Sequence, residues 1–489
     1  MRGDTYSMDP VVQRIIALPS INSSCSLDAL MPSSTLTYVL PLLAWISLVL
    51  LGSIFTTSRL GFLSFQRSLS ELCSGRRSRL DVLDVFRVVA IFWVMINHTG
   101  SEGRIDILER HPSAEVFKKN VHEHPVFGAL LGNSALGVEI FLVLSGLLAA
   151  RSWLRQADEP FMAHYKKFIS RRVFRLAPSI FVFIYLAAGP MMKALLPRYT
   201  STMISACGVS GILAHLSFIG NWMSTPTCLG YLWYLGLDMQ LYVAAPFLLH
   251  ILHKKPKTAV IISAVIVALS AALRAGYCTV YGVCNRSDVD IPFIAYPNQT
   301  PESLAKIYDG LWQMYGRPLT KCGPFVLGLL FGCYTVKFDK TVISNRLSNI
   351  IFSFSLALCL AVIYAILPEY WYPDQGNTLY NTVYTAVFRT VFSSGIIGMI
   401  FSLVYREQSI TVAHNWAILG RLTYTAYLLH MPIIYVFNFL PFLQNATGAL
   451  ELIAVIPFVA VLSFGAAALF YVVIESPMGN LSLLATKRL

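Results

Sequence analysis

Charged residues are scarce in this sequence, because Asp, Glu, Lys and Arg together make up only 13% of its 489 residues. A water-soluble chain of this length would form two or three domains, with a surface that is roughly a quarter to a third charged. The shortage of charge therefore excludes an ordinary soluble protein.

Three other features are missing. The sequence has no Cys-x-x-Cys pair and no Cys/His spacing of the kind that binds a metal. The Lys and Arg residues that give a net charge of +12 form short clusters between apolar runs rather than one basic domain, so neither a metal site nor nucleic-acid binding is predicted. No compact signal peptide with a cleavage site precedes the first apolar run, which is expected to be an uncleaved anchor.

Hydrophobic residues, by contrast, make up 56% of the chain, and the mean hydropathy is +0.61. Many of them lie in runs close to the ~20 residues that cross a bilayer. The runs are Leu36–Phe55, Val82–Asn97, Ala135–Ala150, Leu176–Leu196, Tyr231–Leu252, Thr258–Leu273, Gly323–Val336, Ile350–Leu367, Tyr384–Tyr405, Ala417–Phe437 and Ala449–Ile474. They predict an all-α polytopic membrane helix bundle with ten or eleven spans. The shorter run Gly211–Trp222 is expected to be re-entrant or interfacial.

The basic residues of the loops predict the orientation. One set of alternate loops holds 21 of the 37 Lys and Arg residues. This set comprises Thr56–Arg79, Arg151–Arg175, His253–Lys257, Lys337–Asn349, Arg406–Trp416 and the tail after Glu475. Because cytosolic loops carry the excess of Lys and Arg, we expect a lumenal N-terminus and a cytosolic C-terminus. The endoplasmic reticulum is favoured because no other sorting signal is found, with the plasma membrane as the alternative.

Glycosylation sequons and cysteines agree with this orientation. Four Asn-x-Ser/Thr patterns fall on the predicted lumenal side, at Asn22, Asn285, Asn298 and Asn445. A fifth, at Asn480, falls on the cytosolic side, and such short patterns often occur by chance. Disulfides persist in the lumen, where Cys207 with Cys228 and Cys278 with Cys284 form plausible pairs, although the sequence alone does not fix their connectivity.

The same signals divide the chain into five parts. These are a lumenal segment (1–35), an extra anchor helix (36–55), a basic cytosolic linker (56–80), a membrane domain (81–478) and a cytosolic tail (479–489).

A functional site is expected where polar side chains occur at bilayer depth, because each is costly there unless it is paired or faces a cavity. Arg87 and His98 lie eleven positions apart in one apolar run, which puts them on nearly the same helix face, about 16 Å apart along the axis. They could line one internal tunnel. Alternatively, Arg87 snorkels or pairs with Asp84, and His98 is an ordinary interfacial residue.

Other polar residues also fall within predicted spans. Asp238 and Gln240 lie in one span, surrounded by Trp233, Tyr234 and Tyr242. Asp238 is expected to face the cavity or to pair with a buried Arg, either Arg389 or Arg87, and a purely structural pair is equally compatible with the sequence. His430 could line the same cavity, although a packing histidine is the commoner case.

Six short motifs occur in order along the chain, and together they resemble the acyltransferase-3 superfamily, in particular its nose-resistant-to-fluoxetine-like group. They are Arg87 with His98, the segment Gly137–Gly146 (GVEIFLVLSG), the segment Arg171–Pro178 (RRVFRLAP), the segment Trp233–Tyr242 (WYLGLDMQLY), the segment Arg317–Pro324 (RPLTKCGP) and the segment Leu422–His430 (LTYTAYLLH).

The resemblance implies a membrane O-acyltransferase that uses acyl-coenzyme A as co-substrate, with no permanently bound cofactor. His98 would be the general base, because imidazole titrates near neutrality. Glu139 would orient His98, or it is simply an acid favoured at a helix N-terminus. Arg87, Arg172 and Arg175 would bind the coenzyme A phosphates. Expected partners are membrane lipid, acyl-coenzyme A and a hydroxyl acceptor, which could be a lipid, a sugar or a small molecule.

The chain departs from the group in two ways. Only about 35 residues precede the first predicted span, where relatives commonly carry a large Cys-containing domain, so any function of that domain is expected to be absent. Glu139 also replaces the Asp that the family often has, which keeps the carboxylate. Two other functional classes fit a polytopic protein with buried charge. A transporter would show internal repeats, and none is found; an inactive regulator that binds a lipid or partner is the second alternative.

Overall fold

The structure is a computed structural model that describes residues 35–56, 60–74, 78–100, 120, 124–156, 159–204, 207–223, 228–284, 301–371, 378–408, 412–438, 440 and 448–486. Within these ranges the regular structure is helical, without a β-strand. The prediction of an all-α polytopic bundle is confirmed.

The helices, in chain order, have the following bounds. They are α2 (Thr35–Ile54), η2 (Gly61–Leu63), α3 (Phe65–Cys73), α4 (Val82–Gly100), α7 (Phe127–Gly132), η4 (Ser134–Leu136), α8 (Gly137–Leu154), α9 (Phe161–Ala188), α10 (Pro190–Leu195), α11 (Pro197–Met203), α12 (Val209–Leu216), η5 (Gly220–Trp222), η6 (Gly230–Leu232), α13 (Trp233–Lys254), α14 (Pro256–Tyr281), α16 (Pro301–Tyr315), α17 (Pro318–Lys337), α18 (Asn345–Tyr364), α19 (Leu367–Trp371), α20 (Leu379–Val404), α21 (His414–Asn438), α23 (Ala449–Phe470), the π-helical η8 (Tyr471–Glu475) and α24 (Ser476–Thr486).

Each of the eleven predicted spans overlaps one of these long helices, and the span Leu176–Leu196 extends beyond the end of α9 into α10. Nine helical segments in the described ranges are long and apolar enough to cross a membrane. The other two predicted spans correspond to α9 and α21, which have 28 and 25 residues but are less apolar. The chain is therefore an integral, multi-pass membrane protein.

One predicted boundary is wrong. The basic segment that ends at Arg175 was expected to be a loop, but most of it is the first half of α9, which begins at Phe161 and ends at Ala188. The run Gly211–Trp222 was not expected to be a full span, and it forms only α12 and η5. The eight residues of α12 span about 12 Å at 1.5 Å per residue, which is too short to cross a bilayer. Helix α16 was not predicted. The predicted linker contains η2 and α3.

Local signals explain several helix ends. The side chains of Ser344 and Thr378 accept hydrogen bonds from the backbone at the starts of α18 and α20, as N-caps do. Pro256 and Pro318 lie in the first turns of α14 and α17, where a missing N–H costs nothing. Helix α14 is capped by Gly282, whose φ of +71° is in the left-handed region that favours glycine.

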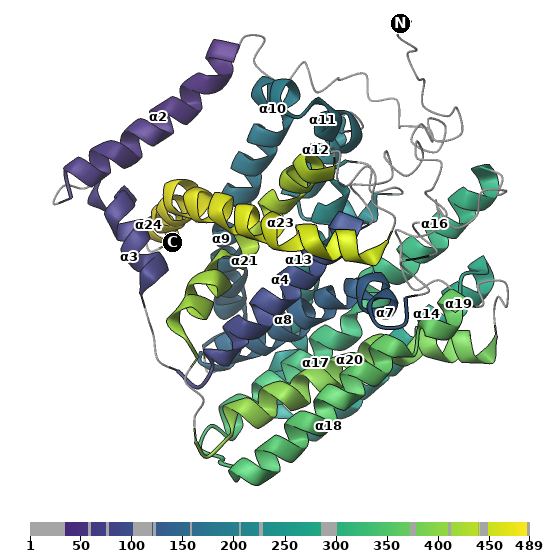
Figure 1. Cartoon of the computed structure of the whole chain (residues 1–489). Coiled ribbons are helices and arrows are strands. Elements are labelled where there is room, and N and C mark those ends of the chain that lie inside the picture. Colours follow the sequence, from purple (N-terminus) through teal and green to yellow (C-terminus); the bar gives the residue numbers. More distant parts are fainter. Residues whose placement is uncertain are drawn as a thin grey trace, which may run out of the picture.

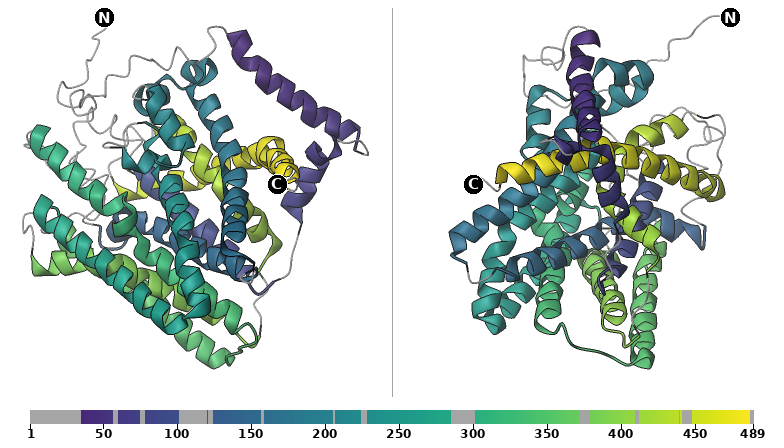
Figure 2. Two further views of the ribbon diagram at one scale, coloured as in Figure 1. Left: turned by 180° about the vertical axis from the view of Figure 1, so that it is seen from behind. Right: turned by 90° about the vertical axis from the view of Figure 1, so that its left-hand side faces the viewer.

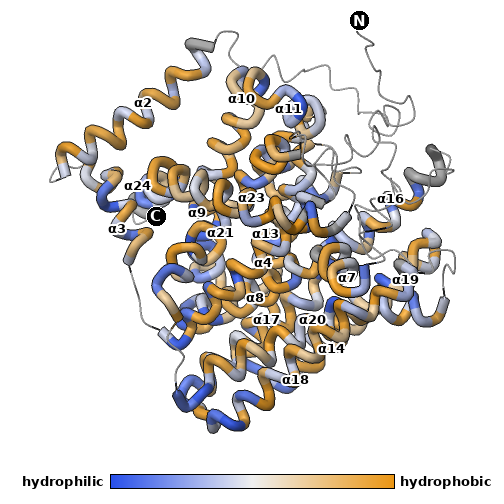
Figure 3. Tube along the Cα trace, in the orientation of Figure 1, coloured by the Kyte–Doolittle hydropathy of each residue, from blue (hydrophilic) through white to orange (hydrophobic). Residues whose placement is uncertain are grey.

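The degree of burial separates central helices from peripheral ones. In the spanning segments of α8 and α17, 67% of residues are buried, compared with 17% in α2, 22% in α14 and 28% in α18. Figure 1 shows α2 apart from the main bundle, and the reverse view in Figure 2 shows it again at the margin. Hydrophobic residues cover the lengths of these peripheral helices, while hydrophilic ones gather near the helix ends (Figure 3). The peripheral helices therefore present apolar faces suited to lipid.

Glycines allow α8 and α17 to pack closely. Gly328 and Gly332 form a Gly-x-x-x-Gly pair on α17, a spacing that lets membrane helices approach each other. A Cβ atom at Gly328 would overlap the backbone oxygen of Val143, and one at Gly146 would overlap that of Phe325. This contact fixes the distance between the two helices that carry Glu139 and Lys321.

Replacing Gly328 with alanine is therefore expected to destabilise the protein by about 1–3 kcal/mol, the usual cost of overpacking. Unfolding of detergent-solubilised protein would measure the loss. Gly465→Ala on α23 is the matched control, because nothing lies within 4 Å of the added Cβ and alanine is the better helix former. Equal stability of the Gly328 variant and the control would contradict the packing argument.

Candidate functional site

His98 and His430 form a buried pair between α4 and α21, which pack against each other. The Nδ1 atom of His98 lies 2.6 Å from Nε2 of His430. The ring centroids are 4.9 Å apart and the ring planes differ by 14°. This centroid separation matches the nitrogen–nitrogen distance plus two ring radii, so the rings lie edge to edge and nearly coplanar. The contact is an in-plane hydrogen bond rather than a face-to-face stack.

The hydrogen bonds of the pair determine its tautomers. Nδ1 of His430 lies 2.6 Å from the carbonyl oxygen of Tyr427, and a carbonyl can only accept, so this nitrogen carries the hydrogen. In the neutral ring, Nε2 of His430 is then the acceptor, and Nδ1 of His98 donates to it. This assignment leaves the lone pair of His98 on Nε2, which makes Nε2 the basic nitrogen.

Glu139, in the first turn of α8, bonds two cations instead of a histidine. Its Oε1 atom accepts from Nζ of Lys321 on α17 and from Nη1 of Arg389 on α20. The side chains of Glu139 and Lys321 are fully buried, and that of Arg389 is 4% exposed. The expectation that Glu139 orients His98 is corrected, because the Nδ1 atom of His98 is bonded to His430 and the carboxylate to Lys321 and Arg389.

Aromatic rings connect this buried ion cluster to the histidine pair. The ring of Tyr315 lies 4.2 Å from Nζ of Lys321 and its centroid is 4.6 Å from that of Trp233. Trp233 contacts Tyr234, and Tyr234 contacts Tyr427, with centroid distances of 6.1 Å in both cases. Trp233 and Tyr234, both predicted site residues, therefore lie between Lys321 and the residue whose carbonyl bonds His430.

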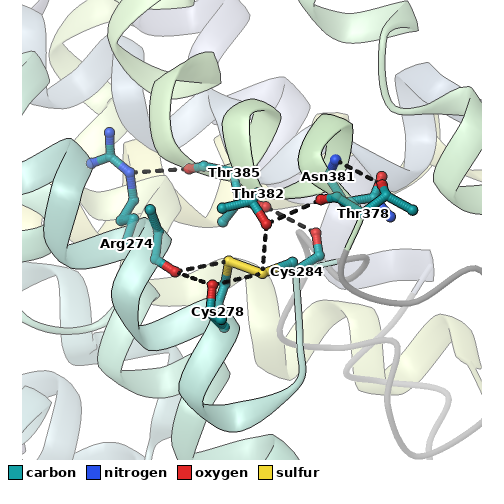
Figure 4. Close-up of a disulfide and its surroundings, with 9 residues drawn as sticks. Arg274, Cys278, Cys284, Thr378, Asn381, Thr382 and Thr385 are labelled. Atoms are coloured by element: carbon teal, nitrogen blue, oxygen red, sulfur yellow. Dashed lines mark hydrogen bonds between the residues drawn. A yellow bond between two sulfur atoms is a disulfide. The ribbon is translucent and has the colours of Figure 1, made fainter.

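Arg274 is a third buried cation in this region. Its guanidinium donates to the carbonyl oxygens of Thr385 at 3.2 Å and Thr320 at 2.6 Å, and also to that of Ala386. Figure 4 shows it on α14 near the Cys278–Cys284 disulfide, with Thr385 of α20 beside it. Arg274 thus links α14 to α17 and α20.

Sequence reasoning missed both Arg274 and Lys321. The predicted spans ended at Leu273 and began at Gly323, one residue before Arg274 and two residues after Lys321. The signal was therefore a charge at the edge of a span rather than within it. Extending each apolar run by one helical turn would have identified both.

Asp238 on α13 pairs with Arg172 on α9. Ser145 on α8 joins them, since its hydroxyl donates to Oδ1 of Asp238 at 2.5 Å and accepts from Arg172 at 3.2 Å. The guanidinium of Arg172 also lies 4.1 Å from the centroid of the Tyr242 ring. The predicted partners of Asp238, Arg389 and Arg87, are both wrong. Arg87 pairs with Asp84, as the structural alternative predicted.

Gln240 and Arg317 belong to a different network. Gln240 accepts from the indole of Trp222 at 2.9 Å and donates to the carbonyl of Phe218 at 2.8 Å. Arg317 donates to the carbonyl of Asn221 at 2.5 Å. These two predicted site residues hold the segment around η5 against α13 and α17, apart from the histidine pair.

A pocket of about 400 Å³ opens beside the middle of α9 and the first half of α21. It is lined by Glu71, Arg171, Phe174, Arg175, Arg421, Tyr471, Glu475, Ser476, Gly479 and Asn480. Two of these residues lie on the π-helical turn η8, a distortion often found at functional sites. Arg421 donates to the carbonyls of Glu71 at 2.7 Å and Leu72 at 2.5 Å, near the end of α3. Arg171 and Arg175 add two further cations to the pocket wall.

Both suggested cysteine pairs, Cys207–Cys228 and Cys278–Cys284, are disulfide-bonded in the structure. The four predicted glycosylation sites, Asn22, Asn285, Asn298 and Asn445, lie outside the described residues.

Comparison with known proteins gives the family. The model of an acyltransferase domain matches residues 80–472, most of the chain. The chain belongs to the acyltransferase-3 family. A protein named Regulator of hypoxia-inducible factor 1, from Caenorhabditis elegans, is 60% identical over 460 residues, which cover 94% of this chain and 91% of that relative.

A second relative, Nose resistant to fluoxetine protein 6 of Caenorhabditis elegans, is 21% identical over 409 residues, which cover 76% of this chain and 47% of that relative. No solved structure matches the chain. The acyltransferase-3 match begins at residue 80, so it contains the histidine pair, the Glu139 cluster and the Asp238–Arg172 pair, whereas α2 and α3 precede it.

Proposed function

We propose that this acyltransferase-3 protein transfers an acyl group from cytosolic acyl-coenzyme A to a hydroxyl acceptor at the lumenal or membrane face. The observation that carries the proposal is the His98–His430 pair, because its hydrogen bonds assign the lone pair to Nε2 of His98. A neutral, buried imidazole with a defined basic nitrogen is suited to general base catalysis. His430 acts as a positioning residue that holds the His98 ring in one tautomer.

In the proposed reaction, Nε2 of His98 removes the proton from the acceptor hydroxyl. The acceptor oxygen then attacks the thioester carbonyl, and a new carbon–oxygen bond forms. As the carbon–sulfur bond breaks, the coenzyme A thiolate leaves and takes the proton from His98. The step therefore needs base, thioester and acceptor, and it returns His98 to its neutral state without another reactant.

The pocket lined by Arg171 and Arg175 supports a cytosolic site for the donor. Its wall also includes Glu71 and the residues just after Glu475, which belong to segments that loop charge assigns to the cytosol. Guanidinium groups bind phosphates in forked pairs. Of the three arginines expected to bind coenzyme A, Arg87 and Arg172 are already paired with carboxylates, while Arg175 lines the pocket beside Arg171. We therefore assign phosphate binding to Arg175 and Arg171.

The proposed orientation places the N-terminus in the lumen and the C-terminus in the cytosol, with the endoplasmic reticulum favoured over the plasma membrane. Both disulfides lie in segments assigned to the lumen, where such bonds persist. The acceptor would accordingly be presented from the lumen or from the membrane.

The 60% identical relative is named a regulator of hypoxia-inducible factor 1, so we also propose a role in hypoxia signalling. An inactive regulator that binds a lipid or partner is the second candidate function, and that name favours it. The two are separated by a His98→Ala variant that remains folded and correctly localised. Loss of the biological effect indicates an enzyme, and full retention indicates a binding role.

The direct test is turnover of radiolabelled acyl-coenzyme A by detergent-purified protein. The wild type is expected to hydrolyse the thioester or transfer the label, and no turnover in the presence of membrane lipid would contradict the proposal. Arg175→Ala is expected to raise KM for acyl-coenzyme A by about tenfold or more, since a charge-assisted hydrogen bond contributes about 1.5–3 kcal/mol. Arg346→Ala, an exposed cation at the start of α18, is the matched control, and an equal KM in both variants would exclude Arg175 from the donor site.

A further inference from the structure

The turn just before α13 is held in place from three directions. The Cys207–Cys228 disulfide joins it to the segment after α11. Nε2 of His215 donates to the carbonyl of Cys228 at 2.6 Å, and the backbone N–H of Leu229 donates to the carbonyl of Met203 at 2.9 Å. Leu229 has a φ of +46°, in the left-handed region that a leucine rarely adopts. Such a backbone persists only where its surroundings hold it.

This turn places Tyr231 against α21, at the residues next to His430. Tyr231 is fully buried. Its hydroxyl donates to the carbonyl of Leu428 at 3.2 Å and lies 3.2 Å from the hydroxyl of Tyr199. Its own carbonyl accepts from the hydroxyl of Tyr427. The Tyr231 ring meets the ring of His430 edge to face, with centroids 5.5 Å apart and planes at 82°.

These contacts act on the groups that define the tautomer of the pair. Tyr231 restrains Tyr427, whose carbonyl bonds Nδ1 of His430, and it also packs against the His430 ring itself. A shift of this residue would move both the ring that orients His98 and the carbonyl that fixes its tautomer. Position matters here, because a displacement of 1 Å in a catalytic group can cost about 10²-fold in rate.

We propose that Tyr231 is a positioning residue for the His98–His430 pair, and that the Cys207–Cys228 disulfide keeps it there. The inference rests on the proposed function and deepens it, because transfer then depends on a bond that forms in an oxidising compartment. Reduction of this disulfide allows the turn before α13 to move, and the hydrogen-bonded geometry of His98 and His430 is then less well defined. The protein becomes fully active only after its lumenal segment is oxidised.

The experiment measures turnover of radiolabelled acyl-coenzyme A by the purified full-length protein across a range of pH. Tyr231→Phe keeps the ring but removes the bond to Leu428, and Cys207→Ser/Cys228→Ser removes the disulfide. The double variant is expected to lose about 10- to 100-fold in kcat, with KM for acyl-coenzyme A unchanged. Tyr231→Phe is expected to lose less. In both, the apparent pKa of the kcat/KM profile should shift, which a loss of folded protein alone would not cause.

The matched control is Cys278→Ser/Cys284→Ser, which removes the other disulfide (Figure 4) and leaves Cys207, Cys228 and the turn before α13 unsubstituted. It is expected to keep the wild-type kcat. Dithiothreitol should lower kcat of the wild type and of this control, but should not lower further that of the Cys207→Ser/Cys228→Ser variant. The effect of dithiothreitol on the wild type does not depend on the folding of any variant.

Wild-type kcat and an unchanged pH profile in both Tyr231→Phe and Cys207→Ser/Cys228→Ser would overturn the inference while leaving the proposed acyltransferase intact. An equal loss in the Cys278→Ser/Cys284→Ser control would also overturn it, because the effect would then reflect disulfides in general. Absence of turnover in the wild type would overturn the proposed function and this inference with it.

Discussion

Replacement of His98 with alanine is expected to lower kcat for acyl transfer by about 10²- to 10⁴-fold, the usual contribution of a general base. The loss should be in kcat rather than in KM for acyl-coenzyme A, because neither His98 nor His430 lines the proposed donor pocket. Radiolabelled acyl-coenzyme A and detergent-purified protein provide the measurement. His98 and His430 are both buried, so the folded fraction of each variant must be determined alongside.

His414→Gln provides the matched control, because His414 is exposed and begins the same helix that carries His430. It should retain wild-type kcat. His430→Gln is expected to show a smaller loss than His98→Ala, since it removes the orienting ring but leaves the base. A His98→Ala protein that turns over at the wild-type rate would exclude His98 as the base and favour the binding role.

The fold could be predicted from the sequence because the bilayer imposes a length on each apolar run. Every predicted span therefore corresponds to a helix, even where its limits were wrong. The clearest error, the start of α9, arose because Arg172 and Arg175 were assigned to a loop by their charge. Arg172 is tolerated inside the helix because Asp238 neutralises it, and that partner is 66 positions away in the sequence.

The site could be predicted only in part, for a related reason. The sequence identified which helices carry polar groups, but partner choice depends on how each helix is rotated and packed. The bond between His98 and His430 could not be predicted because 332 residues separate them, and a packing histidine is the commoner case for a residue such as His430. Glu139 was expected to orient His98, but from its position on α8 its side chain bonds Lys321 of α17 and Arg389 of α20 instead. The roles of Lys321 and Arg274 were missed because they lie just beyond the predicted spans.

The buried cluster around Glu139 predicts the largest effect on stability. Two cations share one carboxylate oxygen, and among the described residues no other acidic side chain bonds either of them. Glu139→Gln keeps the shape but removes the negative charge, which leaves Lys321 and Arg389 uncompensated in a site that excludes water. Breaking a buried ion pair in this way costs about 3–5 kcal/mol. Unfolding of the detergent-solubilised variant by denaturant should therefore require much less denaturant than the wild type.

A second substitution separates charge from packing. Lys321→Met in the Glu139→Gln background removes one of the two uncompensated cations at similar volume, so it should restore about half of the lost stability or more. Glu159→Gln is the matched control, because its ion pair with Lys167 has both side chains at least 36% exposed and such pairs contribute about 0–1 kcal/mol. If Glu139→Gln were no more destabilising than Glu159→Gln, the charges of Glu139, Lys321 and Arg389 would not stabilise one another, and the argument for a buried ion cluster would be wrong. If Lys321→Met instead deepened the loss, Lys321 would stabilise α17 through Tyr315 and its other neighbours rather than through the carboxylate.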